Sequence, residues 1–233
     1  MQVFFPEDSD FLEKFLHYKS GLILFSGPVS SGKTTTIYHL LRNKYAEEPI
    51  QIITMEEPVE IKEPKFLQTE VNEKAGLSYE KLIKQSLRHH PDILVIGEIR
   101  DEETAKMVIR SALTGHLVLA SIHAKECTGV IERMLELGMS LEQLKQSLIG
   151  VVSQRLINKN CPHCEGACSI YCNHFPIHQK KAIIFEILAA NDLKTALKGE
   201  GENPRPRKMN SQLRKAYGCG FITAKDFREH QIY

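Results

Sequence analysis

A glycine- and serine-rich stretch with one lysine, Gly27–Thr34 (GPVSSGKT), is the first candidate for chemistry. Its spacing matches G-x-x-x-x-G-K-[ST], in which the glycines let the backbone curl so that successive N–H groups face a phosphate. Lys33 would bring a positive charge to the β- and γ-phosphates, and the Thr34 hydroxyl would bind Mg²⁺. The alternative interpretation is a flexible turn. We predict a nucleotide site formed by Gly27, Ser30, Ser31, Gly32, Lys33, Thr34 and Thr35.

A glutamate that follows an apolar run is the candidate for activating water. Glu98 comes just after Ile93–Ile96, and no aspartate directly follows that run. A carboxylate in this place can orient and deprotonate the water that attacks a γ-phosphate. Asp92 precedes the run, roughly 20 Å away at about 3.3 Å per residue, and cannot share the site. The alternative for Glu98 is a surface Glu-Arg-Asp turn.

A second acidic cluster, EEPVE, begins at Glu56. Carboxylates near phosphates repel them unless Mg²⁺ or an ordered water lies between. We interpret Glu56 as a residue that positions metal or water, and a solvated acidic loop is the alternative. Two histidines flank another apolar run, Leu117–Ala120. His116 stands at its start, so only His123, at its end, is expected near the phosphates.

The elements that must position these residues are apolar runs separated by helical patterns. Runs apolar on both faces are typical of buried parallel strands, and their alternation with helices predicts an α/β fold with a mainly parallel sheet. The runs are Leu22–Phe25, Ile52–Met55, Ile93–Ile96 and Leu117–Ala120. The expected helices are Lys33–Asn43, Ser78–His89, Glu102–Thr114, Glu126–Leu137 and Leu141–Arg155, the last opened by a capping box. Carboxyl ends of parallel strands share one sheet edge, where the predicted site residues should meet.

Four cysteines crowd into a short segment after the last of these helical patterns: Cys161, Cys164, Cys168 and Cys172. In a reducing compartment such a cluster favours a metal over disulfides. The first pair has the C-x-x-C spacing of zinc sites, whereas the second pair is C-x-x-x-C. Free thiols are the alternative. The histidines that could replace a cysteine are His163, His174 and His178. We expect a structural zinc site, because four protein ligands leave no open coordination position.

Length and composition set the remaining limits. The 233 residues are 42% hydrophobic and carry a net charge of +1, which argues against a domain that mainly neutralises nucleic-acid phosphates. No apolar stretch approaches the ~20 residues that span a bilayer. We therefore expect a cytoplasmic protein with two parts, residues 1–157 as the nucleotide-binding core and residues 158–233 as a small, mostly helical region with the cysteine cluster.

With these residues assembled, the chain resembles the secretion and type IV pilus motor ATPases, from about Gly21 to its end. Four motifs in order carry the resemblance: Gly27–Thr36, Ile53–Glu60, Leu87–Asp101 and Thr114–His123. It implies a RecA-like P-loop fold that hydrolyses ATP with Mg²⁺. In that family the glutamate matching Glu98 is the catalytic base and the one matching Glu56 positions Mg²⁺ and water. The histidines matching His116 and His123 sense nucleotide or are structural.

The cysteine segment resembles the tetracysteine zinc site of the assembly-type motors, and its short form is similar to that of the competence ATPases of transformable Gram-positive bacteria. The resemblance implies a homohexamer that powers a transformation pilus for DNA uptake. It also implies a membrane platform protein as partner, peripheral attachment to the inner face of the cell membrane, and no direct nucleic-acid binding. Type II secretion or general pilus assembly is the alternative, followed by a small-molecule kinase and a non-hydrolysing regulator.

The chain departs from the family pattern in several places. Ser30 stands where a glycine is usual, Glu57 replaces an aspartate, and Ala124-Lys125 replaces Thr-Asn or Thr-Thr. Family members also carry an N-terminal domain that supplies arginines to the nucleotide, whereas here only 26 residues precede Gly27. We therefore expect that domain to be absent and the ATPase activity of the isolated chain to be weak.

Overall fold

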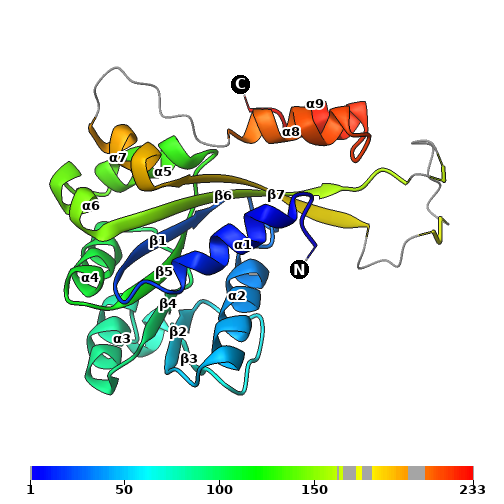
Figure 1. Cartoon of the computed structure of the whole chain (residues 1–233). Coiled ribbons are helices and arrows are strands. Elements are labelled where there is room, and N and C mark those ends of the chain that lie inside the picture. The colour runs from blue at the N-terminus through cyan, green and yellow to red at the C-terminus, as the bar shows by residue number, and fades with distance from the viewer. Residues whose placement is uncertain (1, 162, 165–171, 175–179, 199–207, 233) are drawn as a thin grey trace.

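A computed structural model describes residues 2–161, 163–164, 172–174, 180–198 and 208–232. Its centre is a seven-stranded sheet in the order β3-β2-β4-β5-β1-β6-β7 (Figure 1). Neighbouring strands run parallel except β7, which is antiparallel to β6. The strands are β1 (Gly21–Ser26), β2 (Ile52–Glu56), β3 (Leu67–Glu70), β4 (Ile93–Ile96), β5 (Leu117–Ile122), β6 (Leu148–Asn158) and β7 (Lys181–Ala189). The predicted α/β fold with a mainly parallel sheet is confirmed.

Helices cover both faces of this sheet. They are α1 (Pro6–Phe15), α2 (Lys33–Glu47), α3 (Tyr79–Ser86), α4 (Glu102–Leu113), α5 (Cys127–Glu136), α6 (Leu141–Ser147), α7 (Ala190–Lys198), α8 (Met209–Gly218) and α9 (Ala224–His230). Because side chains alternate along a strand, β1 contributes to two cores. Leu22 and Leu24 pack with α3 to α7, whereas Ile23 and Phe25 pack with α1 and α2. This burial on both faces explains why β1 contains an unbroken apolar run, Leu22–Phe25.

A third, smaller core lies over the β6–β7 end of the sheet. There α8 supplies Met209 and Leu213, which pack against Ile157 of β6 and Ile184 of β7. Figure 1 shows α8 and α9 side by side above these two strands. The prediction of helices near the C-terminal end of the chain is confirmed.

The predicted helix Leu141–Arg155 is wrong beyond its first two turns. The capping box between Ser140 and Gln143 is present, but α6 ends at Ser147 and β6 begins at Leu148. Leu144, Leu148 and Val152 recur every four residues, and this spacing is the sequence pattern that favours a helix here. The β-branched run that follows instead pairs with β1 and β7, and a buried strand gains hydrogen bonds along both of its edges.

Glycine and sheet pairing shape this part of the fold. A Cβ at Gly150 would lie 2.5 Å from the Phe15 ring, so glycine lets α1 approach β6 closely. From beyond the predicted boundary near Ile157, β7 pairs with β6 along nine residue pairs, Gly150 to Asn158. The division into residues 1–157 and 158–233 stays a prediction. The described helices include none that is both long and apolar enough to cross a membrane.

Candidate active site

The P-loop lies between β1 and α2, where the sequence predicted it. Gly27 and Gly32 have backbone φ angles of 144° and 86°, values that residues with a Cβ rarely adopt. A Cβ on Gly27 would also lie 2.5 Å from the backbone oxygen of Gln154. Lys33 Nζ donates hydrogen bonds to the carbonyl oxygens of Gly27 at 3.0 Å and Pro28 at 3.2 Å. Burial of the Lys33 ammonium lowers its pKa.

Ser30 adopts a left-handed conformation, with φ of 60°. This conformation costs a residue with a Cβ roughly 1–2 kcal/mol, whereas glycine adopts it freely. Ser30 is the residue that replaces the glycine usual in the motor ATPases that the chain resembles. Ser30 therefore adopts a backbone conformation for which glycine is better suited.

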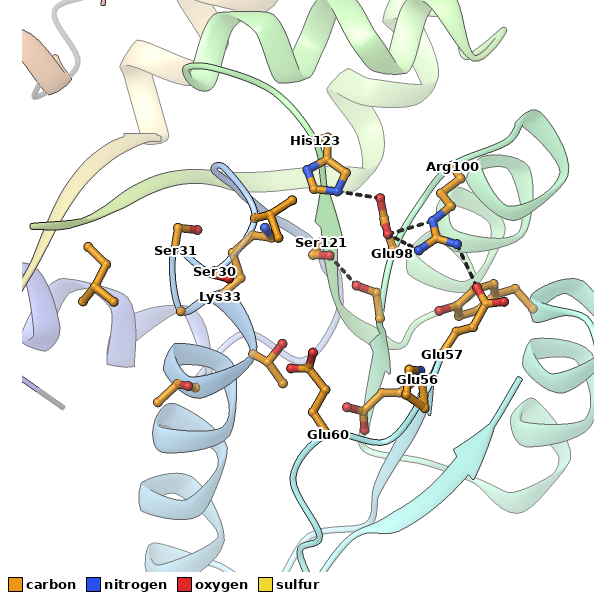
Figure 2. A pocket seen from close by; sticks show the side chains of 18 residues that line it. Ser30, Ser31, Lys33, Glu56, Glu57, Glu60, Glu98, Arg100, Ser121 and His123 are labelled. Atoms are coloured by element: carbon orange, nitrogen blue, oxygen red, sulfur yellow. Dashed lines mark hydrogen bonds and ion pairs between the residues drawn. The ribbon is translucent and has the colours of Figure 1, made fainter. Parts of the chain in front are cut away.

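A cavity of about 540 Å³ opens above the P-loop at the carboxyl edge of the sheet. Its lining includes most of the predicted site residues, namely Ser30, Ser31, Gly32, Lys33, Thr34, Thr35, Glu56, Glu98 and His123. In Figure 2, Ser30, Ser31 and Lys33 lie across this space from Glu98 and Arg100. Residues far apart in sequence thus converge because four strands end at one edge.

Glu98 is held by two partners. Its Oε1 lies 2.9 Å from His123 Nε2, and its Oε2 lies 2.7 Å from the guanidinium of Arg100. Arg100 also reaches Glu57 Oε2 at 2.9 Å, and these contacts appear as dashed lines in Figure 2. The hydrogen bond to Glu98 raises the pKa of Arg100. Glu98 and His123, which were predicted to lie at the same sheet edge, are therefore in contact, and Arg100 fixes the direction of the carboxylate.

Glu56 is buried at the end of β2, and hydrogen bonds fix its carboxylate. Tyr38 Oη and Thr54 Oγ1 both donate to Oε1, the latter at 2.8 Å, and Gln68 in turn donates to Tyr38 Oη at 2.8 Å. Burial raises the pKa of Tyr38, so the phenol stays a donor at neutral pH. Glu56 therefore reaches the cavity in a fixed orientation, as expected of a group that positions a ligand.

The cavity has a surplus of negative charge before any ligand binds. Four carboxylates line it, those of Glu56, Glu57, Glu60 and Glu98, against the two basic side chains Lys33 and Arg100. A polyphosphate alone would meet net repulsion there, whereas a magnesium complex would carry compensating charge. Thr34 lines the same space, so the residues present fit a bound Mg²⁺ ion.

Two predicted or considered residues lie away from this cavity. His116 precedes β5 at the opposite sheet edge, with Nδ1 3.3 Å from the Ser111 carbonyl oxygen, so this chain does not bring it to the P-loop. Asp92 accepts a hydrogen bond from the Gln51 backbone N–H at 2.7 Å at that same edge. The exclusion of Asp92 from the site is confirmed.

Sequence reasoning missed several residues of the site. Arg100 was visible two residues after Glu98, where strand-like spacing could have suggested that the two side chains meet. Tyr79 lines the cavity from α3, and burial raises its pKa. Gln154 donates from Nε2 to the Ser31 carbonyl oxygen at 2.6 Å. Gln154 gave no signal because its segment was predicted to be helical.

The cysteine cluster forms a separate group between β6 and β7. The ligand atoms of Cys161, Cys164, Cys172 and His174 all lie within 4.8 Å of one another. His174 Nδ1 is 3.3 to 3.4 Å from each of the three sulfurs, and Cys172 Sγ is 3.7 and 3.9 Å from the other two. The structure thus brings His174 to three of the predicted ligands. Cys168 and His178 lie outside the described residues, so the role of Cys168 stays a prediction.

Comparison of the sequence with known proteins relates this chain to secretion proteins. A family model described as Type II/IV secretion system protein matches residues 2–223. The relative named Competence protein ComGA from Bacillus subtilis is 38% identical over 227 residues, which are 96% of this chain and 64% of the relative. The Streptococcus pneumoniae protein of that name is 55% identical over 137 residues, 59% of this chain and 43% of the relative. The chain spans less than two thirds of the length of these relatives.

Solved structures give the same picture. The pilus retraction motor PilT with bound ADP aligns with a TM-score of 0.74 and 29% identity, covering 96% of this chain and 65% of that one. The ATPase DotB of Legionella pneumophila aligns with a TM-score of 0.72 over 94% of this chain and 62% of its own. At 17% identity the likeness to DotB supports the fold alone.

Proposed function

The chain belongs to the type II/IV secretion system protein family, and from that premise we propose that it is the ATP-hydrolysing part of a motor that assembles a transformation pilus for DNA uptake. The observation that carries ATP hydrolysis is the cavity that joins the P-loop to Glu98 and His123. The relatives named Competence protein ComGA support the assignment to competence. The alternative is a type II secretion or general pilus assembly ATPase.

The charged and hydroxyl groups around the P-loop and Glu98 have distinct roles in this proposal. Lys33 and the P-loop N–H groups bind the phosphates, and Thr34 and Glu56 would hold Mg²⁺ and its water. The ion, when bound, neutralises charge on the β- and γ-phosphates. Glu98 accepts the proton of the attacking water while Arg100 and His123 keep its carboxylate directed. Because each carboxylate oxygen has two acceptor positions, Glu98 can bind water without losing either partner.

Two variants test the chemistry. Lys33→Ala removes the positive charge that faces the phosphates, so we expect loss of nucleotide binding. Glu98→Gln keeps the shape and loses the base, so we expect binding within about threefold of wild type and a kcat lower by about 10²–10⁴-fold. Phosphate release and fluorescent ADP binding measure these effects. Unchanged turnover by Glu98→Gln would remove the assignment of the base, and phosphate transfer to a small molecule would favour a kinase.

The assembly belongs to the same proposal. We propose a homohexamer bound peripherally to the inner face of the cell membrane through a platform protein, with no direct contact to nucleic acid. Native mass spectrometry with and without ATP and Mg²⁺ reads the number of subunits. A chain that stays monomeric with nucleotide, both alone and joined to the N-terminal domain that the family resemblance implies, would contradict the hexamer.

We also propose that the cysteine cluster holds one structural Zn²⁺ ion. A tetrahedron with Zn–S bonds of about 2.3 Å and a Zn–N bond of about 2.0 Å has edges of roughly 3.8 Å between sulfurs and 3.5 Å between sulfur and nitrogen. The sulfur–sulfur distances of 3.7 and 3.9 Å and the sulfur–nitrogen distances of 3.3 to 3.4 Å match these edges. Three cysteines with His174 form the better-supported ligand set.

Zinc content decides between the two ligand sets. If His174 is the fourth ligand, His174→Ala should lose zinc measured by elemental analysis, and Cys168→Ser should keep about one ion per chain. The reverse result would support the tetracysteine site predicted from the sequence. A wild-type protein purified with no metal after growth in zinc would contradict both sets.

A further inference from the structure

A fully buried glutamine behind the P-loop has no part in the chemistry proposed above. Gln154 lies on β6 with 0% of its surface exposed, and its Nε2 donates to the Ser31 carbonyl oxygen at 2.6 Å. Its Oε1 has no hydrogen-bond partner within the described part of the chain. A buried polar atom without a partner costs stability, and an apolar side chain of similar size would avoid that cost. The amide is therefore explained better by its effect on the P-loop than by packing.

The bond to Ser31 controls which way one peptide unit of the P-loop faces. In a trans peptide the carbonyl of one residue and the N–H of the next point in opposite directions. When the Ser31 carbonyl is held toward β6, the N–H of Gly32 is directed away from β6. Both Ser31 and Gly32 line the cavity, and Lys33 begins α2 directly after them. A rotation of this peptide would replace an N–H group that donates a hydrogen bond to phosphate with a carbonyl oxygen that repels phosphate.

The main chain of Gln154 also restricts the P-loop, at Gly27. The backbone oxygen of Gln154 lies 2.5 Å from the position of a Cβ on Gly27, and its Nε2 lies 3.5 Å from that on Gly32. One residue of β6 therefore contacts both ends of the loop, through its main chain at Gly27 and its side chain at Ser31. This contact spans 123 positions of sequence, so it exists only in the folded sheet.

The next residue of β6 makes a similar contact on the opposite side of the strand. Arg155 donates from its guanidinium to the Lys125 carbonyl oxygen, and Ser153 Oγ lies 3.4 Å from that same oxygen. Lys125 follows His123 by two residues, and His123 contacts Glu98. Consecutive side chains of one strand thus fasten the phosphate-binding loop and the turn that carries the partner of the base.

We propose that Gln154 is a positioning residue for phosphate binding, which keeps the Ser31–Gly32 peptide turned so that its N–H faces the nucleotide. The inference rests on the proposed ATPase function for its biological meaning, but the binding of phosphates can be measured without hydrolysis. It assigns to β6, a strand with no residue in the chemical step, a direct effect on affinity for the polyphosphate chain.

The first test removes the donor and keeps the volume. Gln154→Met should raise the dissociation constant of magnesium pyrophosphate about tenfold, measured by calorimetry, and should raise the KM for ATP by the same factor with a smaller change in kcat. Gln212→Met is the matched control, because Gln212 is also buried but lies on α8. Its pyrophosphate affinity should equal that of wild type. Wild-type affinity in the folded Gln154→Met protein would overturn the proposal.

A second variant covers the case in which Gln154→Met fails to fold. In Gln154→Glu the buried carboxyl can donate to the Ser31 oxygen only when it is protonated, and burial favours protonation. The ratio of variant to wild-type pyrophosphate affinity should therefore fall as the pH rises from 5.5 to 8.5. A ratio that does not change with pH would contradict the role. If the wild-type protein binds pyrophosphate but does not hydrolyse ATP, the proposed function is rejected and this inference still stands.

Discussion

The cavity at the carboxyl edge of the sheet and the cysteine cluster beyond β6 are built in opposite ways. The cavity takes its charged groups from the ends of separate strands, from Lys33 to His123. The cluster takes its ligand atoms from one short stretch, Cys161 to His174. A site drawn from distant segments depends on the sheet for its geometry, whereas the local cluster would depend on the zinc ion proposed for it. The two sites should therefore respond differently to metal removal and to substitution.

Zinc removal should separate the two regions most strongly. A zinc-selective chelator with excess Mg²⁺ should make the segment between β6 and β7 susceptible to protease, because metal binding is what orders such a cluster. Affinity for fluorescent ADP should change by less than about twofold, since no cysteine lines the cavity among the described residues. Limited proteolysis and fluorescence titration measure the two effects. Loss of nucleotide affinity along with zinc would show that the sites are coupled.

Arg100→Met should damage the cavity and spare the cluster. The substitution removes the cation that holds Glu98 and Glu57, so we expect kcat to fall by roughly 10–100-fold with KM little changed. His116→Ala is the control at the other end of β5 and should keep activity within about threefold. Steady-state kinetics with a zinc assay on both proteins test this. An Arg100→Met protein as active as wild type would show that Arg100 does not direct the base.

A buried carboxyl outside both regions makes the stability of the fold depend on pH. Glu186 of β7 is 2% exposed and accepts a hydrogen bond from the Cys127 backbone N–H at 3.3 Å, and burial raises its pKa from 4.5 to about 7. The folded state then binds more protons than the unfolded state between these values, so stability should fall as pH rises from about 4.5 to 7. The loss is at most about 3 kcal/mol.

Glu186→Gln should remove most of this pH dependence and should be more stable than wild type at pH 8. Urea unfolding at pH 5.5 and pH 8 measures the difference. The charged and titratable groups that act on Glu186 are Arg155 from β6, Glu126 and Cys127 at the start of α5, and Lys208, which directly precedes α8. An equal change in the free energy of unfolding between pH 5.5 and pH 8 for both proteins would mean that Glu186 is ionised at both pH values.

Ser30→Gly should have the smallest effect. Relief of the left-handed conformation and the greater freedom of glycine in the unfolded chain oppose each other, so stability should change by less than about 1 kcal/mol. The restored glycine should leave kcat within about threefold and raise ADP affinity slightly. Thermal unfolding and ADP titration measure both. A large loss of affinity would mean that the Ser30 side chain itself contacts the nucleotide.

The nucleotide cavity could be predicted from sequence because its signals are local. The P-loop spacing and the apolar runs before Glu56, Glu98 and His123 each need only a few residues, and parallel strands bring their ends together. Gln154 could not be found in this way. Its segment carries apolar residues at helical spacing, and the pairing that makes it a strand comes from β1 and β7, which are distant in sequence. His174 was considered as a substitute ligand, but spacing alone could not rank it against Cys168.

The bonds from Lys33 to the Gly27 and Pro28 carbonyls have a consequence for the speed of binding. A loop that already holds its own lysine in place does not have to be ordered by the nucleotide, so less conformational entropy is lost in the complex. Association should then be limited by encounter. Rapid mixing with a fluorescent nucleotide should therefore give a single phase whose rate rises linearly with concentration.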